Sequence, residues 1–249
     1  MCEECGCGEP AAPHTHDSDG HTHGAMGHHH THRIDINKDV MEKNNEIARG
    51  NRAFFEAQGL YAVNLISSPG SGKTALLEAM AGVFGGKLAV IEGDIQTSRD
   101  SERVIRAGSR AAQIETGGAC HLDAHGVSHA LEDLDLKGCE ILVIENVGNL
   151  VCPAAYDLGE HLKVAILSLP EGDDKVLKYP AIFSRIGALI IGKVDLAPHM
   201  EFDVRKAVNE CKSLNRKFET FEISAKTGKG VKDYCDFLVA SRRKIFQDQ

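Results

Sequence analysis

The stretch LYAVNLISSPGSGKT, residues 60–74, restricts the possible folds of this chain more than any other segment. Its apolar first half indicates a buried strand, and SSPGSGKT has the spacing of a phosphate-binding loop that opens a helix. In such a loop, backbone N–H groups surround phosphate oxygens at the helix N-terminus. We expect the phosphates of a nucleotide to be bound by five consecutive residues, Gly70, Ser71, Gly72, Lys73 and Thr74.

Two side chains of this loop have predicted roles beyond backbone binding. Lys73 is expected to neutralise the β- and γ-phosphate oxygens, and the Thr74 hydroxyl is expected to ligate Mg²⁺. Two positions depart from the usual pattern, because Ser67 replaces the first glycine and Ala75 replaces a common hydroxyl residue. We expect Ala75 to weaken one contact to the α-phosphate. A Gly/Ser-rich turn without a nucleotide is the alternative interpretation.

Apolar strands alternate with amphipathic helical patterns along the rest of the chain. Strands are predicted at 60–67, 87–94, 139–145, 163–168, 186–192 and 218–223, and helices at 37–58, 72–84, 98–107, 202–214 and 230–246. This alternation is typical of an α/β fold in which helices cover both faces of a mostly parallel sheet. We therefore predict a P-loop NTPase domain over residues 34–249.

Residues 1–33 differ from the rest of the chain in composition. They hold three of the eight cysteines, eight of the 13 histidines and almost no large apolar side chains. We predict a disordered tail unless metal orders it, because it cannot bury enough surface to offset its ordering entropy. Cys2, Cys5 and Cys7, with the N-terminal amine, offer four donors to a square-planar Ni²⁺, although a thiol tail without fixed metal is the alternative. The histidines indicate metal storage or buffering, with an expression tag as the other interpretation.

Charge and hydropathy exclude several classes of protein. The net charge of −8 argues against nucleic-acid binding, which favours a basic surface. No apolar run approaches the roughly 18 residues of a membrane span, and no basic segment followed by an apolar one marks a signal peptide. We therefore expect a cytoplasmic protein without membrane association, in which cysteines are thiols or metal ligands rather than disulfides.

Two segments resemble motifs that read guanine, which predicts GTP and GDP as ligands. In ALIIGKVDL, residues 188–196, Lys193 would stack on the base and Asp195 would accept its hydrogen bonds, while Gly192 replaces the usual asparagine. In ISAKTGKG, residues 223–230, a backbone N–H would read the guanine O6 from the loop Ser224, Ala225 and Lys226. Either segment alone could be a chance loop. Their order, each after a strand, favours guanine over adenine.

Two carboxylates follow predicted strands at the edge where the phosphates would lie. Asp94 ends the strand of EGDIQT, and Glu145 ends the strand ILVIE. We expect both near Mg²⁺, with Glu145 acting through water, although a helix N-terminal acid is the alternative for Asp94. Water would be the nucleophile, and Lys73, Asp94 and Glu145 would act by positioning and charge neutralisation. No residue is a convincing general base, so slow hydrolysis is expected.

A second group of candidate ligands lies in CHLDAH, residues 120–125, and at Cys152. Cys120, His121, His125 and Cys152 offer two thiolates and one or two imidazoles, a set suited to Zn²⁺ or Ni²⁺. If the segment is helical, His121 and His125 would share one face, with His129 beside them. Buried cysteines and a capping histidine are the alternative interpretation.

The loop ENVGNLVCP, residues 145–153, connects the two predicted sites. Cys152 follows Glu145 and Gly148 on this loop, and both of these residues are expected to respond to the γ-phosphate. We therefore hypothesise that nucleotide state changes metal affinity, and that metal binding changes nucleotide affinity by the same factor.

Over essentially its whole length the chain resembles the HypB family of hydrogenase nickel-incorporation accessory GTPases. The resemblance is carried by CEECGCG, the histidine-rich run, SSPGSGKT, EGDIQT, GGACHLDAH, ENVGNLVCP, EGDDKVLKYP and ISAKTGKG. The family belongs to the SIMIBI-type branch of GTPases, with signal-recognition and MinD-like proteins. The resemblance implies GTP-dependent homodimers that slowly hydrolyse GTP to GDP and phosphate while delivering Ni²⁺ to the hydrogenase large subunit. It also implies a HypA-type nickel-binding partner.

The same resemblance implies particular site residues. An interface metal would be held by Cys120, His121 and Cys152, and His125 would match a second metal site of some members. Lys175 or Lys178 in EGDDKVLKYP would lie near the dimer interface and could reach nucleotide, or lie in a solvated loop. Two other functions are considered: a nickel or zinc storage protein with weak nucleotide turnover, and a urease-accessory GTPase. The urease-accessory GTPase is disfavoured because that family resembles proteins with a C-P-H metal site and lacks a cysteine triad such as Cys2, Cys5 and Cys7.

Overall fold

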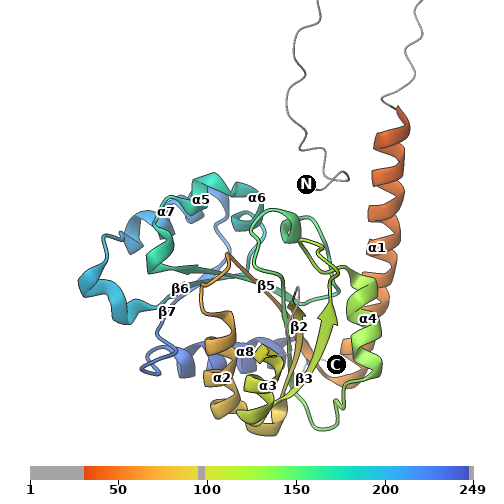
Figure 1. Cartoon of the computed structure of the whole chain (residues 1–249), viewed down its shortest axis with the longest axis horizontal. Coiled ribbons are helices and arrows are strands. Elements are labelled where there is room, and N and C mark those ends of the chain that lie inside the picture. Colours follow the sequence, from red (N-terminus) through yellow and green to blue (C-terminus); the bar gives the residue numbers. More distant parts are fainter. Residues whose placement is uncertain (1–30, 95–98, 247–249) are drawn as a thin grey trace, which may run out of the picture. The chain divides into compact units, whose positions relative to one another are not determined.

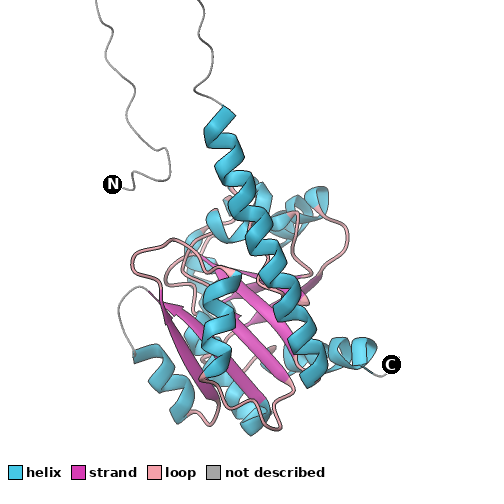
Figure 2. Ribbon diagram, turned by 90° about the vertical axis from the view of Figure 1, so that its right-hand side faces the viewer, coloured by secondary structure: helices cyan, strands magenta, loops and turns pink. Residues whose placement is uncertain are grey.

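The computed structural model describes residues 31–94 and 99–246, which build a seven-stranded sheet (Figures 1 and 2). All strand pairs are parallel, and the order across the sheet is β3-β2-β4-β1-β5-β6-β7. The strands are β1 (Tyr61–Ser67), β2 (Leu88–Asp94), β3 (Arg110–Glu115), β4 (Ile141–Glu145), β5 (Leu162–Ser168), β6 (Ala188–Gly192) and β7 (Glu219–Ile223). Because the strands are parallel, their C-terminal ends meet at one edge.

Helices connect these strands and lie on both faces of the sheet (Figures 1 and 2). They are α1 (Thr31–Gln58), α2 (Lys73–Phe84), α3 (Arg99–Arg106), α4 (Ala124–Glu132), α5 (Lys175–Lys178), α6 (Pro180–Phe183), α7 (Val204–Leu214) and α8 (Val231–Phe246). Short 3-10 helices span Gly85–Lys87, Cys152–Ala154, Leu169–Glu171 and Val194–His199. None of the helices between residues 31 and 246 that the structure describes is long and apolar enough to cross a bilayer.

The chain divides into two compact units, residues 1–37 and 38–249, and the following description concerns the second. Within it, successive strand residues point to opposite faces, which separates the buried side chains into layers. Val63 of β1 packs in a cluster with residues of α2 and α8. Its neighbour Ala62 packs in another cluster, with Phe55 of α1 and residues of α4. A third cluster joins β5 and β6 to α6 and α7.

The predicted α/β fold, a parallel sheet flanked by helices, is confirmed. Several elements differ from the sequence-based expectation, and β3 and α1 are two of them. The sequence does not predict β3, whose segment RAAQIE carries no run of large apolar residues. It is an edge strand and only partly buried, so it needs fewer apolar side chains than the central strands. Helix α1 begins at Thr31 rather than at Asn37.

Candidate functional site

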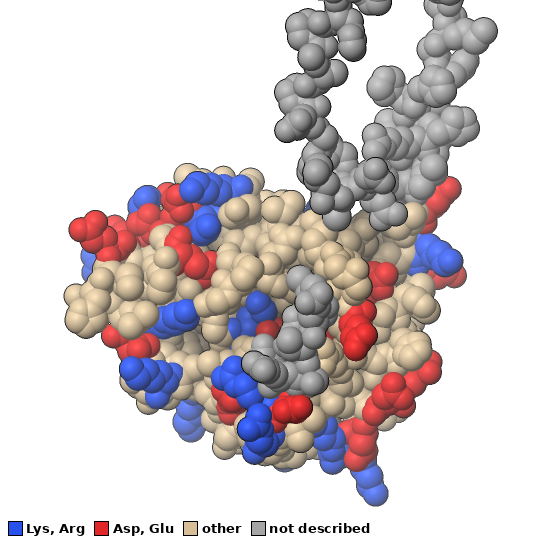
Figure 3. Space-filling model, viewed as in Figure 1, with Lys and Arg blue, Asp and Glu red and all other residues tan. Residues whose placement is uncertain are grey.

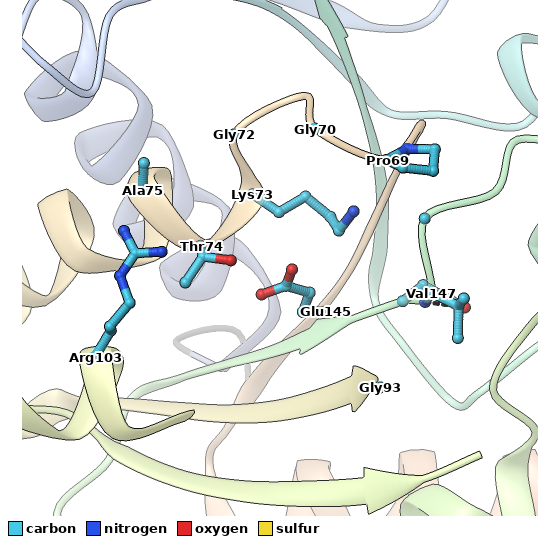
Figure 4. Close-up of a pocket in the computed structure, with 12 residues that line it drawn as sticks. Pro69, Gly70, Gly72, Lys73, Thr74, Ala75, Gly93, Arg103, Glu145 and Val147 are labelled. Atoms are coloured by element: carbon cyan, nitrogen blue, oxygen red, sulfur yellow. Dashed lines mark hydrogen bonds between the residues drawn. The ribbon is translucent and has the colours of Figure 1, made fainter. Parts of the chain in front are cut away.

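The phosphate loop joins the C-terminal end of β1 to α2 and borders a cavity at that edge of the sheet (Figure 4). Its glycines adopt backbone conformations that other residues rarely adopt, with φ of 73° at Gly70 and 100° at Gly72. Lys73 and Thr74 extend their side chains from the first turn of α2 toward this cavity (Figure 4). The loop and helix therefore surround one opening of the size and chemistry expected for phosphates.

Ser67, which stands where a glycine is usual, is integrated into the loop by its hydroxyl group. The hydroxyl donates to the carbonyl oxygen of Ser68 at 2.9 Å and accepts from Ser71 Oγ at 2.5 Å and Lys73 Nζ at 3.0 Å. Ser67 is fully buried. The departure from glycine is thus accommodated by the fold, and it provides a hydrogen-bond acceptor for the Lys73 ammonium group.

Glu145 ends β4 and directs its carboxylate toward Lys73 and Thr74 across the cavity (Figure 4). The residue is 7% exposed. Carboxylate and hydroxyl oxygens are the ligands that Mg²⁺ prefers, so Thr74 and Glu145 fit a nucleotide-bound Mg²⁺. Asp94 is the last residue of β2, next to Gly93, which lines the same cavity. The side chain of Asp94 lies outside the described part of the chain.

Sequence reasoning does not identify Arg103, which lines the same cavity from α3. Its side chain lies near Thr74 and Ala75 in Figure 4. The guanidinium group donates to Glu78 of α2 through Nε at 3.0 Å and Nη2 at 2.7 Å, and this bidentate pairing fixes its orientation. The helix pattern of α3 contains Arg106 as well, so no sequence signal distinguishes the arginine that lines the cavity.

The two predicted base-reading segments meet beside the phosphate loop. Ser224 Oγ donates to Asp195 Oδ1 at 2.7 Å, and Lys193 Nζ donates to the carbonyl oxygen of Gly70 at 2.7 Å. The hydrogen bond from Ser224 lowers the pKa of the Asp195 carboxyl, and the charges of Lys226 and Lys193 act in the same direction. Asp195 is therefore held as an acceptor at neutral pH. Lys193, Asp195 and Lys226 line a pocket with Ala225 and apolar side chains such as Leu76 and Ile166.

Gly192 is tightly enclosed at the position where an asparagine is usual. A Cβ atom at this residue would lie 3.2 Å from Ile166 Cγ2 and 3.6 Å from the carbonyl oxygen of Ser71. The next residue, Lys193, has a φ of 58°, the left-handed region that non-glycine residues rarely adopt. The chain therefore turns sharply at these two residues from β6 into the pocket that Lys193 and Asp195 line.

Cys120, His121 and Cys152 form a cluster of three potential metal ligands. One donor atom from each lies within 4.8 Å of the others. Cys120 Sγ is 2.9 Å from Cys152 Sγ and 3.5 Å from His121 Nδ1, and all three residues are partly buried. Burial lowers the pKa of His121, although the charge of Asp123 opposes this, so the imidazole is neutral at pH 7 and able to ligate. Two sulfurs and a nitrogen suit Zn²⁺ or Ni²⁺.

Tyr156 is a further residue of this cluster that sequence reasoning does not identify. Its ring centroid lies 3.8 Å from that of His121, at an interplanar angle of 33°. The contact covers one side of the imidazole and restricts its orientation. A tyrosine in an irregular loop carries no sequence signal for such a role.

The prediction that His121 and His125 share a helical face is wrong. Helix α4 begins at Ala124, because the side chain of Asp123 caps it by accepting a hydrogen bond from Gly126 N at 2.7 Å. His121 therefore precedes the helix, while His125 lies in its first turn. His125 lines a groove with His121, but it is outside the group of three donors within 4.8 Å. The predicted ligands Cys2, Cys5 and Cys7 lie outside the described residues.

Lysine and arginine side chains are interspersed with aspartate and glutamate on the face shown in Figure 3. Among the residues described there, the basic side chains do not gather into one large patch. This mixture of both signs accompanies a formal net charge of −8.

The chain is similar in sequence and in structure to known proteins of one family. The family model "CobW/HypB/UreG, nucleotide-binding domain" matches residues 61–222. The hydrogenase maturation factor HypB of Rhizobium leguminosarum bv. viciae is 48% identical over 216 residues, 85% of this chain and 72% of that protein. The crystal structure of HypB from Helicobacter pylori in complex with nickel is 41% identical with a TM-score of 0.79, covering 82% of this chain and 97% of that one. HypB from Archaeoglobus fulgidus is 40% identical with a TM-score of 0.75, covering 81% and 99%.

Proposed function

The chain belongs to the HypB family of hydrogenase maturation factors, and on that premise we propose that it is a GTP-hydrolysing metallochaperone for nickel. One observation carries the proposal. The segment that begins at Glu145, in the wall of the phosphate cavity, ends at Cys152, whose thiol is 2.9 Å from that of Cys120. A change at the phosphates therefore has a short covalent route to a metal ligand.

GTP is held in this proposal by the phosphate loop and the two base-reading segments. The N–H groups of residues 70–74 and the Lys73 ammonium bind the phosphates. Asp195 accepts from the guanine ring, Lys193 covers it, and the loop Ser224, Ala225 and Lys226 reads its O6. Arg103, oriented by its pairing with Glu78, presents a guanidinium group to the phosphate cavity, where Ala75 provides no hydroxyl.

Hydrolysis of GTP to GDP and phosphate is proposed to be slow. Thr74, Asp94 and Glu145 would hold Mg²⁺, which neutralises charge on the β- and γ-phosphate oxygens when bound. Lys73 then stabilises the charge that develops on the phosphates, and Glu145 orients the attacking water. No residue of the site is a convincing general base, so we propose that the reaction resets a switch rather than supports rapid turnover.

Nickel is the proposed cargo, bound by Cys120, His121 and Cys152. The cysteine thiols and a protonated imidazole must each lose a proton before they ligate, so affinity falls as the pH falls. The same donor set also suits Zn²⁺, which we propose as an alternative occupant. His125 is close enough along the chain to contribute to a second ion in the adjoining groove.

The remaining features of the proposal come from the sequence. Residues 1–33 would form a metal-binding tail, with Cys2, Cys5 and Cys7 holding Ni²⁺ and the histidines storing further ions. Residues 34–249 would form the GTPase domain, which pairs into a GTP-dependent homodimer in the cytoplasm. Its partners would be a HypA-type nickel protein and the hydrogenase large subunit, and Lys175 or Lys178 would lie near the interface between protomers.

The experiment is a comparison of Ni²⁺ affinity with GDP and with a nonhydrolysable GTP analogue. The chain would carry Cys2, Cys5 and Cys7 as serines, so that sulfur-to-nickel absorption comes from the folded domain. We expect the two affinities to differ by about fivefold or more. Cys152→Ala should weaken binding in both states, whereas Cys139→Ala, at another free cysteine, should not. Equal affinities in the two nucleotide states would remove the proposed coupling.

A substitution at Lys73 distinguishes the metallochaperone from the alternative function, which is metal storage with little nucleotide turnover. Lys73→Ala removes the ammonium group from the phosphate loop and leaves the three metal ligands in place. If the chain is a metallochaperone, the variant retains nickel but fails to support hydrogenase maturation. A storage protein would support maturation to the wild-type level in the same assay.

A further inference from the structure

The loop from Glu145 to Cys152 is packed against the phosphate loop at one residue. An added Cβ atom at Gly148 would lie 3.0 Å from the backbone nitrogen, Cα and Cγ atoms of Pro69. Real Cβ atoms seldom approach other atoms so closely, so only glycine allows these two segments to touch. A movement of the phosphate loop is therefore transmitted directly to Gly148.

The next residue, Asn149, connects this contact to both sulfur ligands. Its Nδ2 donates to the carbonyl oxygen of Cys120 at 3.1 Å, and its Oδ1 accepts from Val151 N at 2.8 Å. Val151 precedes Cys152 in the chain. One partly buried amide thus holds the backbone of Cys120 against the backbone next to Cys152, which fixes the separation of the two thiols.

Asn146, at the start of the same loop, makes a second connection. The residue is fully buried, and its Oδ1 accepts from Leu122 N at 3.2 Å and from Val147 N at 3.0 Å. Leu122 directly follows the ligand His121. The Nδ2 group of Asn146 donates to Asn64 Oδ1 at 3.2 Å, which anchors the amide to the central strand β1.

The segment that carries the ligands also touches the wall of the phosphate cavity. The side chain of Leu122 fills the space in which a Cβ atom on Gly93 would stand, at 2.7 to 2.8 Å. Gly93 lines the phosphate cavity. The ligand segment is therefore packed between the end of β2 and the loop after β4.

We propose that Asn149 and Asn146 are positioning residues that transmit nucleotide state to the Cys120, His121 and Cys152 cluster, an inference that rests on the proposed function. Each side chain holds the loop that borders the phosphates to the segment that carries Cys120 and His121. When Gly148 moves with the phosphates, Asn149 moves both sulfur ligands together, while Asn146 holds Leu122 in place. The geometry of the metal site then depends on the nucleotide.

A matched control exists for Asn149. The side chain of Asn215 makes the same two kinds of bond, donating to the carbonyl oxygen of Ile186 at 2.7 Å and accepting from Lys217 N at 2.8 Å. Asn215 is also partly buried, and it follows α7, away from the phosphates and the cluster. Asn149→Ala and Asn215→Ala therefore remove equivalent local bonds, and only the first acts between the two sites.

The readout is the ratio of the Ni²⁺ dissociation constants with GDP and with the GTP analogue, measured in the cysteine-to-serine background above. We expect Asn149→Ala to bring this ratio within twofold of one while Ni²⁺ is still bound in both states, and Asn215→Ala to keep the wild-type ratio. Asn149→Asp is a nearly isosteric second variant that keeps the acceptor for Val151 N and loses the donor to Cys120 O. Asn149→Asp should also bring the ratio of the two Ni²⁺ dissociation constants closer to one.

Three results have distinct meanings. A wild-type ratio away from one that both Asn149 variants retain overturns the role of Asn149 and leaves the proposed function intact. A wild-type ratio of one overturns the coupling in the proposed function and this inference with it. A ratio that moves toward one in both Asn149 variants and keeps its wild-type value in Asn215→Ala supports the inference. A merely structural role of Asn149 would lower stability without changing the ratio.

Discussion

Substitution of Gly148 by alanine tests the contact between the phosphate loop and the loop after β4. The φ angle of Gly148 lies outside the left-handed region, so alanine meets no backbone strain and the effect comes from the contact alone. The added methyl group would stand 3.0 Å from three atoms of Pro69, two of them backbone atoms of a loop that cannot rotate away. Ordinary contact needs a separation of about 3.4 Å or more, so the two loops must move apart.

The magnitude follows from the cost of overpacking in a well-packed region, which is about 1–3 kcal/mol. If the γ-phosphate draws the two loops together, this cost falls mainly on the GTP-bound state. We therefore expect the affinity for a nonhydrolysable GTP analogue to fall by about 5- to 150-fold, since 1.4 kcal/mol is a factor of ten. GDP should bind Gly148→Ala nearly as well as it binds the wild type.

Isothermal titration of each nucleotide in the presence of Mg²⁺ measures this difference. Gly82→Ala on α2 is the matched control, because a Cβ atom there has no neighbour within 4 Å. It should leave both affinities unchanged and stabilise the helix by about 0.5–1 kcal/mol. Unchanged analogue affinity in Gly148→Ala would refute the idea that the γ-phosphate draws the two loops together.

Three other predictions concern stability and reactivity. Burial lowers the pKa of His161, whose Nδ1 accepts from Ala62 N at 3.0 Å, so the unfolded chain takes up the proton first as the pH falls. Stability should therefore be complete above about pH 6.5 and decline as the pH falls toward the folded-state pKa; thermal unfolding of His161→Gln should show a smaller decline, and an equal decline would contradict this. Asn51→Leu, which removes donors to the carbonyl oxygens of Ala124 and Leu158, should lower the free energy of unfolding by about 1–3 kcal/mol in denaturant titrations, and a change below 0.5 kcal/mol would show the bonds to be dispensable. Burial raises the pKa of the Cys211 and Cys235 thiols to about 12, so alkylation at pH 7 followed by mass spectrometry should modify Cys120 and Cys152 before these two thiols, and more slowly with Ni²⁺ present. Labelling of Cys211 as fast as that of Cys120 would argue against the fold.

Local chemistry explains which features could be predicted from the sequence. The phosphate loop needs only a strand, a set of glycines and a helix in succession, so SSPGSGKT predicts its own conformation. The central strands are buried on both faces, which makes them continuous apolar runs. Strand β3 lies at an edge of the sheet and is only partly buried, and its segment RAAQIE is not a continuous apolar run.

Contacts between distant segments are harder to predict because they depend on the strand order. Cys120 and Cys152 are 32 residues apart, and their proximity follows from the exit of β3 and β4 at the same edge of the sheet. The sequence shows that Cys120 and Cys152 are candidate ligands, but it does not show that Asn149 bonds the backbone of Cys120 and of Val151. Arg103 and Tyr156 are likewise ordinary residues in sequence, and only packing reveals what they contact. The start of α4 can be predicted from the sequence, because Asp123 is a typical N-cap residue.

In the proposed function nucleotide binding and metal binding form one linked equilibrium, and a complete thermodynamic cycle tests this linkage most directly. The cycle requires the Ni²⁺ affinity with GDP and with the GTP analogue, and the affinities of both nucleotides with and without Ni²⁺. Linkage requires the two ratios to be equal. We predict that they agree and differ from one by about fivefold or more, and ratios of one on both sides of the cycle would contradict the account.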